Sequence, residues 1–161
     1  MPMNLSLEGN KAPDFFLAGS DGKMHSLKDY RGKTLVMYFY PKNNTPGCTK
    51  EACAFRAVHG ALEARNTVVL GISRNSLASH QRFISENKLP FVLLSDPQNK
   101  AIKAYSAWGE KKMFGLPIVG PIRSTVVVGP DGTVRKHWER VEKPEDHPQE
   151  VLKYLEQAVA S

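Results

Sequence analysis

The 161-residue sequence predicts an α/β fold in which a central mixed β-sheet is flanked by helices on both faces and preceded by an N-terminal β-hairpin. Two observations predict this class. Short β-branched and aromatic runs alternate with longer segments of helical character, which is the order of β-α-β units. A pair of strands and one last helix follow, and they add antiparallel neighbours to the sheet. Because no repeat or long linker interrupts the sequence, we expect one domain over residues 1–161.

The first half of the chain supplies the hairpin and the first β-α unit. The turn Ser20–Gly22 predicts a hairpin over Phe15–Ser26, and Ser26–Tyr30 predicts one helical turn. The β-branched and aromatic run Thr34–Tyr40 predicts a buried strand. Residues Thr49–Arg65 are rich in Ala, Leu, Glu and Arg, and they predict the helix that follows this strand.

The second half continues the alternation of strands and helices. Segment Trp108–Pro121 is the exception: it holds five glycines and prolines and shows no clear periodicity, so we expect a loop there. The final helix is expected from Pro148, with an apolar side formed by Val151, Leu152, Leu155, Ala158 and Val159. The other expected elements are a buried strand at Thr67–Ser73, a helix at Ser76–Asn87, a short strand at Phe91–Leu94, a short helix at Asp96–Tyr105, and a hairpin of Ser124–Val128 with Thr133–Glu139. This order is thioredoxin-like in outline.

Composition and charge exclude several classes of protein. Hydrophobic residues make up 41% and charged residues 24% of the chain, which excludes intrinsic disorder, and two cysteines are too few for a disulfide scaffold. The net charge of +6 permits a nucleic-acid partner, but acids alternate with bases over Arg135–Asp146, so we expect none. The longest apolar run, Leu35–Tyr40, is far shorter than the roughly 20 residues of a membrane helix. Residues Met1–Lys11 are polar and show no targeting signal, so we expect a soluble, cytoplasmic protein without a membrane partner.

Cys48 occupies a position that favours a reactive thiol. It follows the expected strand and opens the expected helix, for which Thr45 can be the N-cap and Pro46 the first residue. Free backbone N–H groups and the positive end of the helix dipole favour the thiolate, which is the reactive form of cysteine. In a reducing compartment a cysteine pair is also more often catalytic than structural. We therefore expect a nucleophile at Cys48; the alternative is a small buried side chain.

The five-residue spacing from Cys48 to Cys53 leaves two interpretations open. Five residues advance an α-helix by about 140° net and about 7.5 Å, which separates the two Cα atoms by about 8.6 Å. A disulfide rarely tolerates more than about 7 Å, so a Cys48–Cys53 disulfide requires the first helical turns to unwind. Otherwise Cys53 is a core residue beside Ala52 and Ala54. Two cysteines and five scattered histidines do not have the spacing of a zinc site, and we expect no metal.

Three further residues have both a structural and a functional interpretation. Thr45 can cap the helix, or its hydroxyl can meet a molecule that approaches Cys48. Pro41 can end the strand, or its ring can shield the thiolate from water. Arg123, at the edge of the strand Ser124–Val128, is a solvated strand end or a guanidinium that stabilises the thiolate. The residue pattern alone favours the structural interpretation for Thr45 and Pro41 and does not decide the role of Arg123.

The segment around Cys48 closely resembles the active site of the peroxiredoxins. Its core is Pro41-x-x-x-Thr45-x-x-Cys48. The fuller form, Thr-Pro-Gly-Cys-Thr with a second cysteine at Cys53, resembles the peroxiredoxin Q subfamily, also called bacterioferritin comigratory protein. The resemblance extends along nearly the whole chain. The other segments that carry it are Gly9-x-x-Ala-Pro-Asp-Phe15, Leu89–Asp96, Trp108–Lys112 and Arg123–Thr125.

This resemblance implies a thiol peroxidase of the atypical two-cysteine type on a thioredoxin-like fold. Cys48 then matches the peroxidatic cysteine, Cys53 the resolving cysteine, and Arg123 the arginine that activates thiolate and peroxide. Thr45 and Pro41 match the residues around the thiolate. The implied substrates are hydrogen peroxide and organic hydroperoxides, and the implied reductant of the resulting Cys48–Cys53 disulfide is thioredoxin or glutaredoxin. The resemblance also implies antioxidant defence, a monomer, and a reaction without metal, haem or flavin.

A few positions depart from the family pattern. Relatives commonly have aspartate where Asn75 stands, although asparagine can still cap a helix, and Gly129 replaces another common aspartate. Some members place the resolving cysteine in the next helix. Ile84 and its neighbours offer no cysteine there, so the resemblance leaves Cys53 as the resolving residue.

Two other classes of function are the alternatives. A thioredoxin-like disulfide oxidoreductase acting on proteins is disfavoured, because the chain has no Cys-x-x-Cys motif. A basic binding module, for example for nucleic acid, is disfavoured because the basic residues form no stripe.

Overall fold

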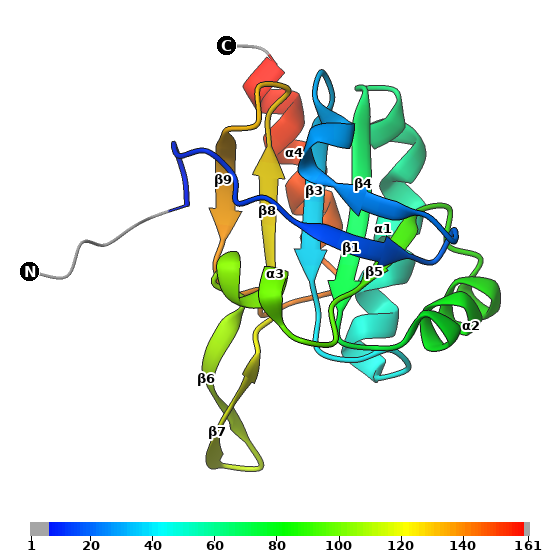
Figure 1. The fold of residues 1–161 in the computed structure, drawn as a ribbon, viewed down its shortest axis with the longest axis vertical. Helices are drawn as coiled ribbons and strands as arrows, with labels where there is room; N and C mark the ends of the chain where they lie inside the picture. The colour runs from blue at the N-terminus through cyan, green and yellow to red at the C-terminus, as the bar shows by residue number, and fades with distance from the viewer. Residues whose placement is uncertain (1–6, 160–161) are drawn as a thin grey trace, which may run out of the picture.

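The computed structural model describes residues 7–159, which form a seven-stranded mixed sheet with helices on both faces and a separate two-stranded hairpin (Figure 1). The order of strands in the sheet is β2-β1-β5-β4-β3-β8-β9. The predicted fold class is confirmed. In chain order the strands are β1 (Phe16–Gly19), β2 (Met24–Ser26), β3 (Thr34–Phe39), β4 (Thr67–Ser73), β5 (Val92–Ser95), β6 (Trp108–Met113), β7 (Leu116–Pro121), β8 (Ser124–Val128) and β9 (Val134–Trp138).

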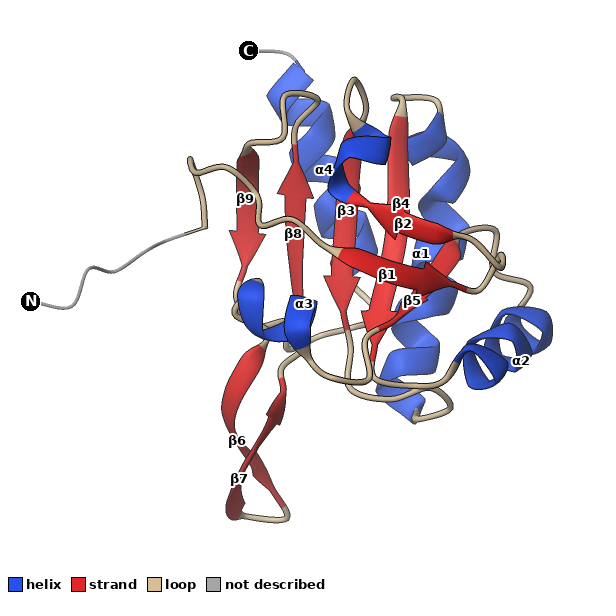
Figure 2. Cartoon of the chain, viewed as in Figure 1, coloured by secondary structure: helices blue, strands red, loops and turns tan. Residues whose placement is uncertain are grey.

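The helices cover the two faces of the sheet unequally (Figure 2). The face that carries α1, α2 and α4 is the more heavily covered, and the 3₁₀ turn η1 and the short helix α3 lie on the other face. The helical elements are η1 (Leu27–Tyr30), α1 (Pro46–Glu63), α2 (Leu77–Asn87), α3 (Lys100–Ala104) and α4 (His147–Val159). No helix within residues 7–159 is both long and apolar enough to cross a membrane.

Strand β3 lies inside the sheet and leads the chain to the start of α1. It pairs in parallel with β4 and antiparallel with β8. Residues on a strand alternate between the two faces of a sheet. Accordingly, Leu35, Met37 and Phe39 belong to the hydrophobic cluster on the α3 face, and Val36 and Tyr38 belong to the cluster under α1, α2 and α4. Burial on both faces explains why β3 reads as a continuous apolar run.

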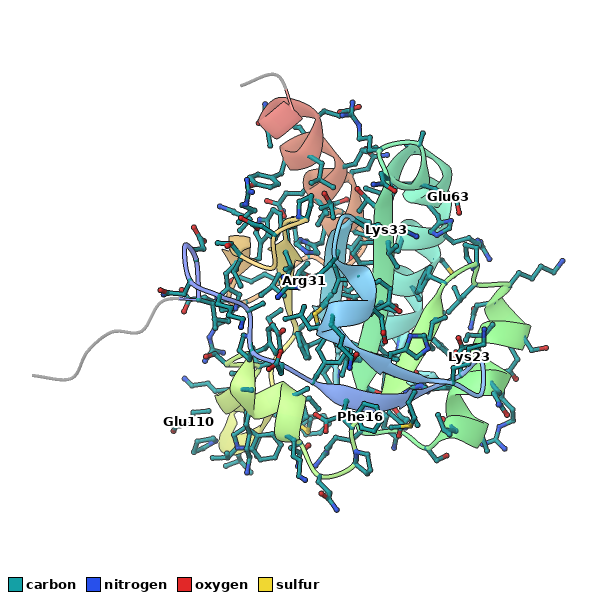
Figure 3. All side chains as sticks on the ribbon, turned by 45° about the horizontal axis from the view of Figure 1, so that its top comes forward. Phe16, Lys23, Arg31, Lys33, Glu63 and Glu110 are labelled. Atoms are coloured by element: carbon teal, nitrogen blue, oxygen red, sulfur yellow. The ribbon has the colours of Figure 1, made fainter. Side chains whose placement is uncertain are left out.

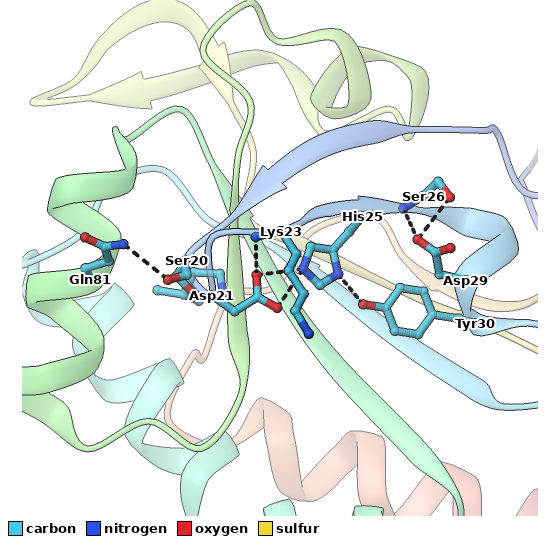
Figure 4. Close-up of polar contacts among 9 residues, drawn as sticks. Ser20, Asp21, Lys23, His25, Ser26, Asp29, Tyr30 and Gln81 are labelled. Carbon is cyan, nitrogen blue, oxygen red and sulfur yellow. Dashed lines mark hydrogen bonds and ion pairs between the residues drawn. The ribbon is translucent and has the colours of Figure 1, made fainter.

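The edge hairpin of β1 and β2 is joined to η1 by polar contacts (Figure 4). The buried ring of His25 lies 2.6 Å from the Tyr30 hydroxyl through Nδ1 and 2.9 Å from Asp21 Oδ1 through Nε2. Asp29 closes η1 by accepting a hydrogen bond of 2.9 Å from the Ser26 backbone N–H. These bonds join the hairpin to η1 beside the apolar contacts of Leu17 and Leu27 with the core.

Charged side chains of both signs are exposed around the molecule, among them Lys23, Arg31, Lys33 and Glu63 (Figure 3). Their mixture is what the alternation of acids and bases in the sequence predicts.

The loop predicted over Trp108–Pro121 is wrong, because this segment forms the hairpin of β6 and β7. Six residue pairs join the two strands, from Trp108 with Pro121 to Met113 with Leu116. A two-residue turn at Phe114 and Gly115 closes it, with φ of 54° and 79°. Such a turn suits the twist of a hairpin. The hairpin projects from the body and half of the residues on each strand are exposed, without the alternation that marks a half-buried strand (Figure 1).

Several element ends also differ from the expectations. Helix α1 begins at Pro46, as the Thr45–Pro46 pattern predicts, but ends at Glu63 rather than Arg65. Helix α4 begins at His147 rather than Pro148. The N-cap of α2 is Ser76, whose hydroxyl accepts from the Ser79 N–H, and Asn75 does not cap the helix. The expectations for residues 1–6 and for the Val159 side chain lie outside the described residues.

Candidate active site

Cys48 lies in the first turn of α1, directly beyond the carboxyl end of β3. The Thr45 carbonyl accepts the first helical bond, from the Thr49 N–H at 2.9 Å, and Pro46 is the first helical residue. Proline suits this position because its missing N–H would have no partner inside the helix. Cys48 is 1% exposed and packs in the cluster that includes Tyr38. The predicted helix start at Thr45–Pro46 therefore does place the Cys48 thiol at a helix N-terminus.

The guanidinium of Arg123 lies against the Cys48 sulfur. Its Nη2 donates to Cys48 Sγ at 3.3 Å. The position follows from strand register: Ser124 at the start of β8 pairs with Phe39 at the end of β3, so Arg123 stands beside the segment that leads into α1. The side chain of Arg123 is only 16% exposed, so it is not a solvated strand end.

Glu51 is the third member of the group around the Arg123 guanidinium, and the sequence pattern did not predict its role. Its Oε1 accepts from Arg123 Nη1 at 2.8 Å, and its side chain is fully buried. Glu51 follows Cys48 by three residues, so one face of α1 presents both side chains to the same guanidinium. An acidic residue at this spacing from the cysteine, on a helix side that faces the core, was the available signal.

Burial is the largest single influence on the pKa values of Glu51 and Arg123. Burial raises the pKa of Glu51 to about 7, although the Arg123 guanidinium beside it acts to lower that pKa. Burial also acts to lower the pKa of Arg123, but Glu51 and Cys48 outweigh it and the net shift is upward. Within residues 7–159, neither Glu51 Oε2 nor the buried Tyr38 hydroxyl has a hydrogen-bond partner. Arg123 is thus the charge that connects the buried carboxyl to the sulfur.

Gly47 leaves room for the Arg123 guanidinium. A Cβ atom at this position would lie 3.1 Å from Arg123 Nη2 and 3.5 Å from Pro144 Cγ. The nearer contact is tighter than most Cβ contacts in proteins, so the guanidinium nitrogen that bonds Cys48 would have to shift by a few tenths of an ångström. The glycine before the cysteine therefore has a steric function in the site.

Pro41 and Thr45 line a pocket of about 580 Å³ at the helix start. The Thr45 hydroxyl donates to the Lys42 carbonyl at 2.9 Å and makes no capping bond, so the predicted side-chain cap is wrong although Thr45 is the N-cap residue. The opposite wall belongs to the β6–β7 hairpin. Besides Pro41 and Thr45, the lining comprises the cationic side chains of Lys42, Arg74 and Lys111, the mainly apolar residues Met113, Ile118, Val119, Gly120, Pro121 and Pro97, and Asn75.

Cys53 does not belong to the group formed by Cys48, Arg123 and Glu51. It is half-buried, and its Sγ donates to Asn87 Oδ1 of α2 over 3.7 Å. Both cysteines are free, and α1 is continuous between them. The structure thus brings Arg123 to Cys48 and places Pro41 and Thr45 in a pocket at the start of the same helix, whose lining includes neither Cys48 nor Arg123. Cys53 makes its contact on α2 instead. Within residues 7–159 no group of three or more His, Cys, Asp or Glu residues is placed to hold a metal ion.

A thioredoxin-type sheet with a buried thiol under a guanidinium is the arrangement of thiol-dependent peroxidases, and comparison with known proteins leads to the same class. A family model described as the AhpC/TSA family matches residues 9–137. Peroxiredoxin Bcp of Bacillus subtilis is 43% identical over 147 residues, which are 91% of this chain and 93% of that protein. A putative peroxiredoxin bcp of Helicobacter pylori is 46% identical over 91% of this chain and 96% of its own length.

Solved structures agree. Peroxiredoxin Q of Xanthomonas campestris superposes with a TM-score of 0.87 at 33% identity, covering 95% of this chain and 99% of that one. The chain therefore belongs to the AhpC/TSA family, within its peroxiredoxin Bcp or Q branch. Membership in this branch implies thiol peroxidase activity, with a peroxide as substrate and a thiol as reductant.

Proposed function

We propose that this protein reduces hydrogen peroxide and organic hydroperoxides through a sulfenic acid on Cys48, that Cys53 resolves this acid as an intramolecular disulfide, and that thioredoxin or glutaredoxin reduces the disulfide. The observation that carries the proposal is the 3.3 Å contact of Arg123 Nη2 with Cys48 Sγ at the first turn of α1. A guanidinium and free helix N–H groups around one sulfur favour its thiolate.

In the first step the Cys48 thiolate attacks the terminal oxygen of the peroxide. The O–O bond breaks, the leaving oxygen takes a proton to become water or alcohol, and the sulfur becomes a sulfenic acid. Arg123 and the helix N–H groups stabilise the negative charge that moves onto the leaving oxygen. The Thr45 hydroxyl donates its hydrogen bond to the Lys42 carbonyl, so its oxygen is free to accept a hydrogen bond from the peroxide O–H. Pro41 covers the pocket beside it.

In the second step the Cys53 thiol attacks the sulfenic sulfur, a disulfide forms and water leaves. In an intact helix the two Cα atoms would be about 8.6 Å apart, beyond the about 7 Å that a disulfide spans, so the start of α1 has to unwind first. The contact of Cys53 Sγ with Asn87 must break at this point. A dithiol reductant then returns two electrons and both thiols.

Two thiols carry both electrons in this cycle, and the steps as written use no metal, haem or flavin. All the groups come from one chain, so the cycle suits a monomer. Because the reductant must be kept reduced, we place the protein in the cytoplasm, in antioxidant defence.

A coupled assay tests the proposal. Peroxide consumption is measured with thioredoxin, its reductase and NADPH, using wild type, Cys48→Ser and Cys53→Ser. We expect turnover by wild type, none by Cys48→Ser, and for Cys53→Ser one equivalent of peroxide consumed with little turnover. Equal turnover by wild type and Cys48→Ser would refute the assignment of Cys48. Replacing thioredoxin by dithiothreitol separates a wrong reductant from a wrong mechanism, and insulin reduction without peroxide would point instead to a disulfide oxidoreductase.

A further inference from the structure

A buried hydrogen-bond network joins the segment between Pro41 and Thr45 to helix α2. Asn43 is 3% exposed and lies midway between these two pocket residues. Its Oδ1 accepts from the Tyr40 hydroxyl at 2.7 Å, and its Nδ2 lies 2.9 Å from His80 Nδ1 and 3.1 Å from Ser79 Oγ. One amide therefore contacts the end of β3 on one side and the first turn of α2 on the other.

His80 anchors this network in the core. Its ring is completely buried, and its Nε2 lies 2.9 Å from the Leu94 carbonyl oxygen of β5. Because a carbonyl only accepts, Nε2 carries the proton and donates, which leaves Nδ1 to accept from the Asn43 amide. Burial lowers the pKa of His80 to about 4, so the ring is neutral near pH 7 and both bonds are present. The imidazole thus has the Leu94 carbonyl at one nitrogen, and the Asn43 amide at the other, where the Tyr40 hydroxyl also lies at 3.4 Å.

The backbone of the same segment is held from the loop before α2. The Asn43 N–H donates to Asn75 Oδ1 at 3.0 Å, and the Ser73 hydroxyl donates to the same oxygen at 2.9 Å. This explains the place of Asn75, which does not cap α2. The segment that carries Pro41 and Thr45 is consequently fixed through both its backbone and its one buried polar side chain.

The far end of α2 contacts the second cysteine. Asn87, the last residue of α2, accepts from Cys53 Sγ over 3.7 Å through its side chain, and its backbone carbonyl accepts from Arg56 of α1. Helix α2 therefore contacts both regions that have to move when Cys48 and Cys53 meet: the segment before Cys48 at its first turn and Cys53 at its last.

We propose that α2 acts as a latch on the thiol form, in which Asn43 and His80 are positioning residues that hold the segment of Pro41 and Thr45, directly before Cys48, in place for reaction with peroxide. This inference rests on the proposed function. Breaking the Asn43–His80 bond leaves buried polar groups without partners, and the segment relieves that cost by leaving its place. A weaker latch then slows peroxide reduction, which needs the pocket residues in place, and speeds disulfide closure, which needs them released.

Variants of His80 separate the bond to the active-site segment from the bond to β5. In His80→Asn the side-chain oxygen can replace Nδ1 as the acceptor for Asn43, and the bond to Leu94 is lost. In His80→Gln the amide can replace Nε2 as the donor to Leu94, and the Asn43 bond is lost. His80→Phe removes both bonds at similar volume, and Asn43→Ala removes the other partner from the connection between β3 and α1, outside the helices and the sheet. Ser85→Ala, at an exposed position of α2, is the matched control.

Three rates are measured in single-turnover experiments on folded variants: Cys48 oxidation by hydrogen peroxide, Cys48 alkylation by iodoacetamide, and closure of the disulfide. We expect Asn43→Ala, His80→Phe and His80→Gln to slow oxidation at least about 10-fold, because each loses at least the buried Asn43–His80 hydrogen bond, while alkylation is not slowed and closure is faster. His80→Asn and Ser85→Ala should oxidise within a factor of about three of wild type. A variant that only weakens the fold should not slow Cys48 oxidation by peroxide while leaving the rate of alkylation by iodoacetamide unchanged.

Two results would overturn the latch: oxidation rates for Asn43→Ala and His80→Phe within twofold of wild type, or His80→Asn as slow as His80→Phe. Circular dichroism melting confirms that each variant is folded, and Asn43→Ala keeps the test decisive if a core variant does not fold. A wild-type protein that peroxide fails to oxidise would instead refute the proposed function, so the two failures are distinguishable.

Discussion

Arg123 Nη2 lies 3.3 Å from Cys48 Sγ, although 75 positions of sequence separate the two residues. The antiparallel register of β3 and β8 brings them together, and Gly47 leaves the guanidinium the space to approach. The second nitrogen of the same fork bonds Glu51 at 2.8 Å. A planar group with fixed donors can bridge a sulfur and a carboxylate in this way, whereas a single ammonium cannot.

This bridge predicts that charge alone cannot replace Arg123. We expect Arg123→Lys to slow Cys48 oxidation by peroxide about 10-fold and Arg123→Met about 100-fold, because a charge-assisted hydrogen bond to the reacting sulfur is weakened or lost. Stopped-flow measurement of single-turnover oxidation gives both rates. Arg82→Met, at an exposed position of α2, should react like wild type. Full activity in Arg123→Met would show that the contact has no part in the reaction.

The steric function of Gly47 predicts a loss of rate without a loss of stability. In Gly47→Ala the new methyl group displaces the end of a flexible arginine side chain rather than backbone, so we expect slower oxidation and a melting temperature close to wild type. Gly60→Ala is the matched control on the same helix, where no atom lies within 4 Å of the new Cβ. That variant should keep wild-type rates and gain about 0.5–1 kcal/mol from the helix propensity of alanine. Equal oxidation rates in Gly47→Ala and Gly60→Ala would contradict the steric function of Gly47.

Glu51 predicts a defined pH dependence of stability. Burial raises its pKa from the ordinary value of 4.5 to about 7 in the folded protein, so between these values the folded state binds more protons at this group than the unfolded state. The contribution of Glu51 to the free energy of unfolding is therefore greatest at low pH and falls as the pH rises through 7. Glu51→Gln should remove this decline, on the order of 3 kcal/mol between pH 5 and pH 8.

Urea unfolding of wild type and Glu51→Gln at several pH values measures the effect. The gap between the two curves should move in favour of Glu51→Gln as the pH rises, whatever constant cost the variant has from losing the Arg123 ion pair. A gap that does not change with pH would mean that Glu51 titrates as it does in the unfolded chain.

The pocket wall formed by β6 and β7 predicts selectivity among peroxides. Ile118 is half-buried in the lining, whereas Phe114 at the hairpin turn is 97% exposed and does not line the pocket. Ile118→Asp should slow oxidation by cumene hydroperoxide about 10-fold, because the aromatic group loses apolar contact, and should change the hydrogen peroxide rate little. Phe114→Asp is the control that adds the same charge outside the pocket. An equal effect on both peroxides would mean that the pocket does not contact the organic group.

The sequence predicted most of the sheet and the position of Cys48 because these depend on local patterns. The apolar run of β3 and the Thr45–Pro46 start of α1 are readable from neighbouring residues. Arg123 is different: its approach to Cys48 depends on strand register, so residue patterns left its role open and the family resemblance was needed to name it.

The features that the sequence did not predict also depend on tertiary structure rather than on local patterns. Glu51 resembles any other glutamate of a charged helix until the fold buries it against Arg123. Half of the residues on each strand of the β6–β7 hairpin are exposed, and they do not alternate with buried ones, which removes the pattern on which strand prediction depends. Asn43 and His80 belong to no motif with a known chemistry, and only their contact across 37 residues indicates a joint role.

The central claim is that Cys48 and Cys53 form one redox pair within the chain. Fully reduced protein is treated with one equivalent of hydrogen peroxide, and its thiols and disulfides are mapped by mass spectrometry after proteolysis. The account predicts an intramolecular Cys48–Cys53 disulfide as the main product, and a sulfenic acid on Cys48 in the Cys53→Ser variant. Persistent sulfenic acid on Cys48 of the wild type, disulfides only between chains, or oxidation that begins at Cys53 would contradict it.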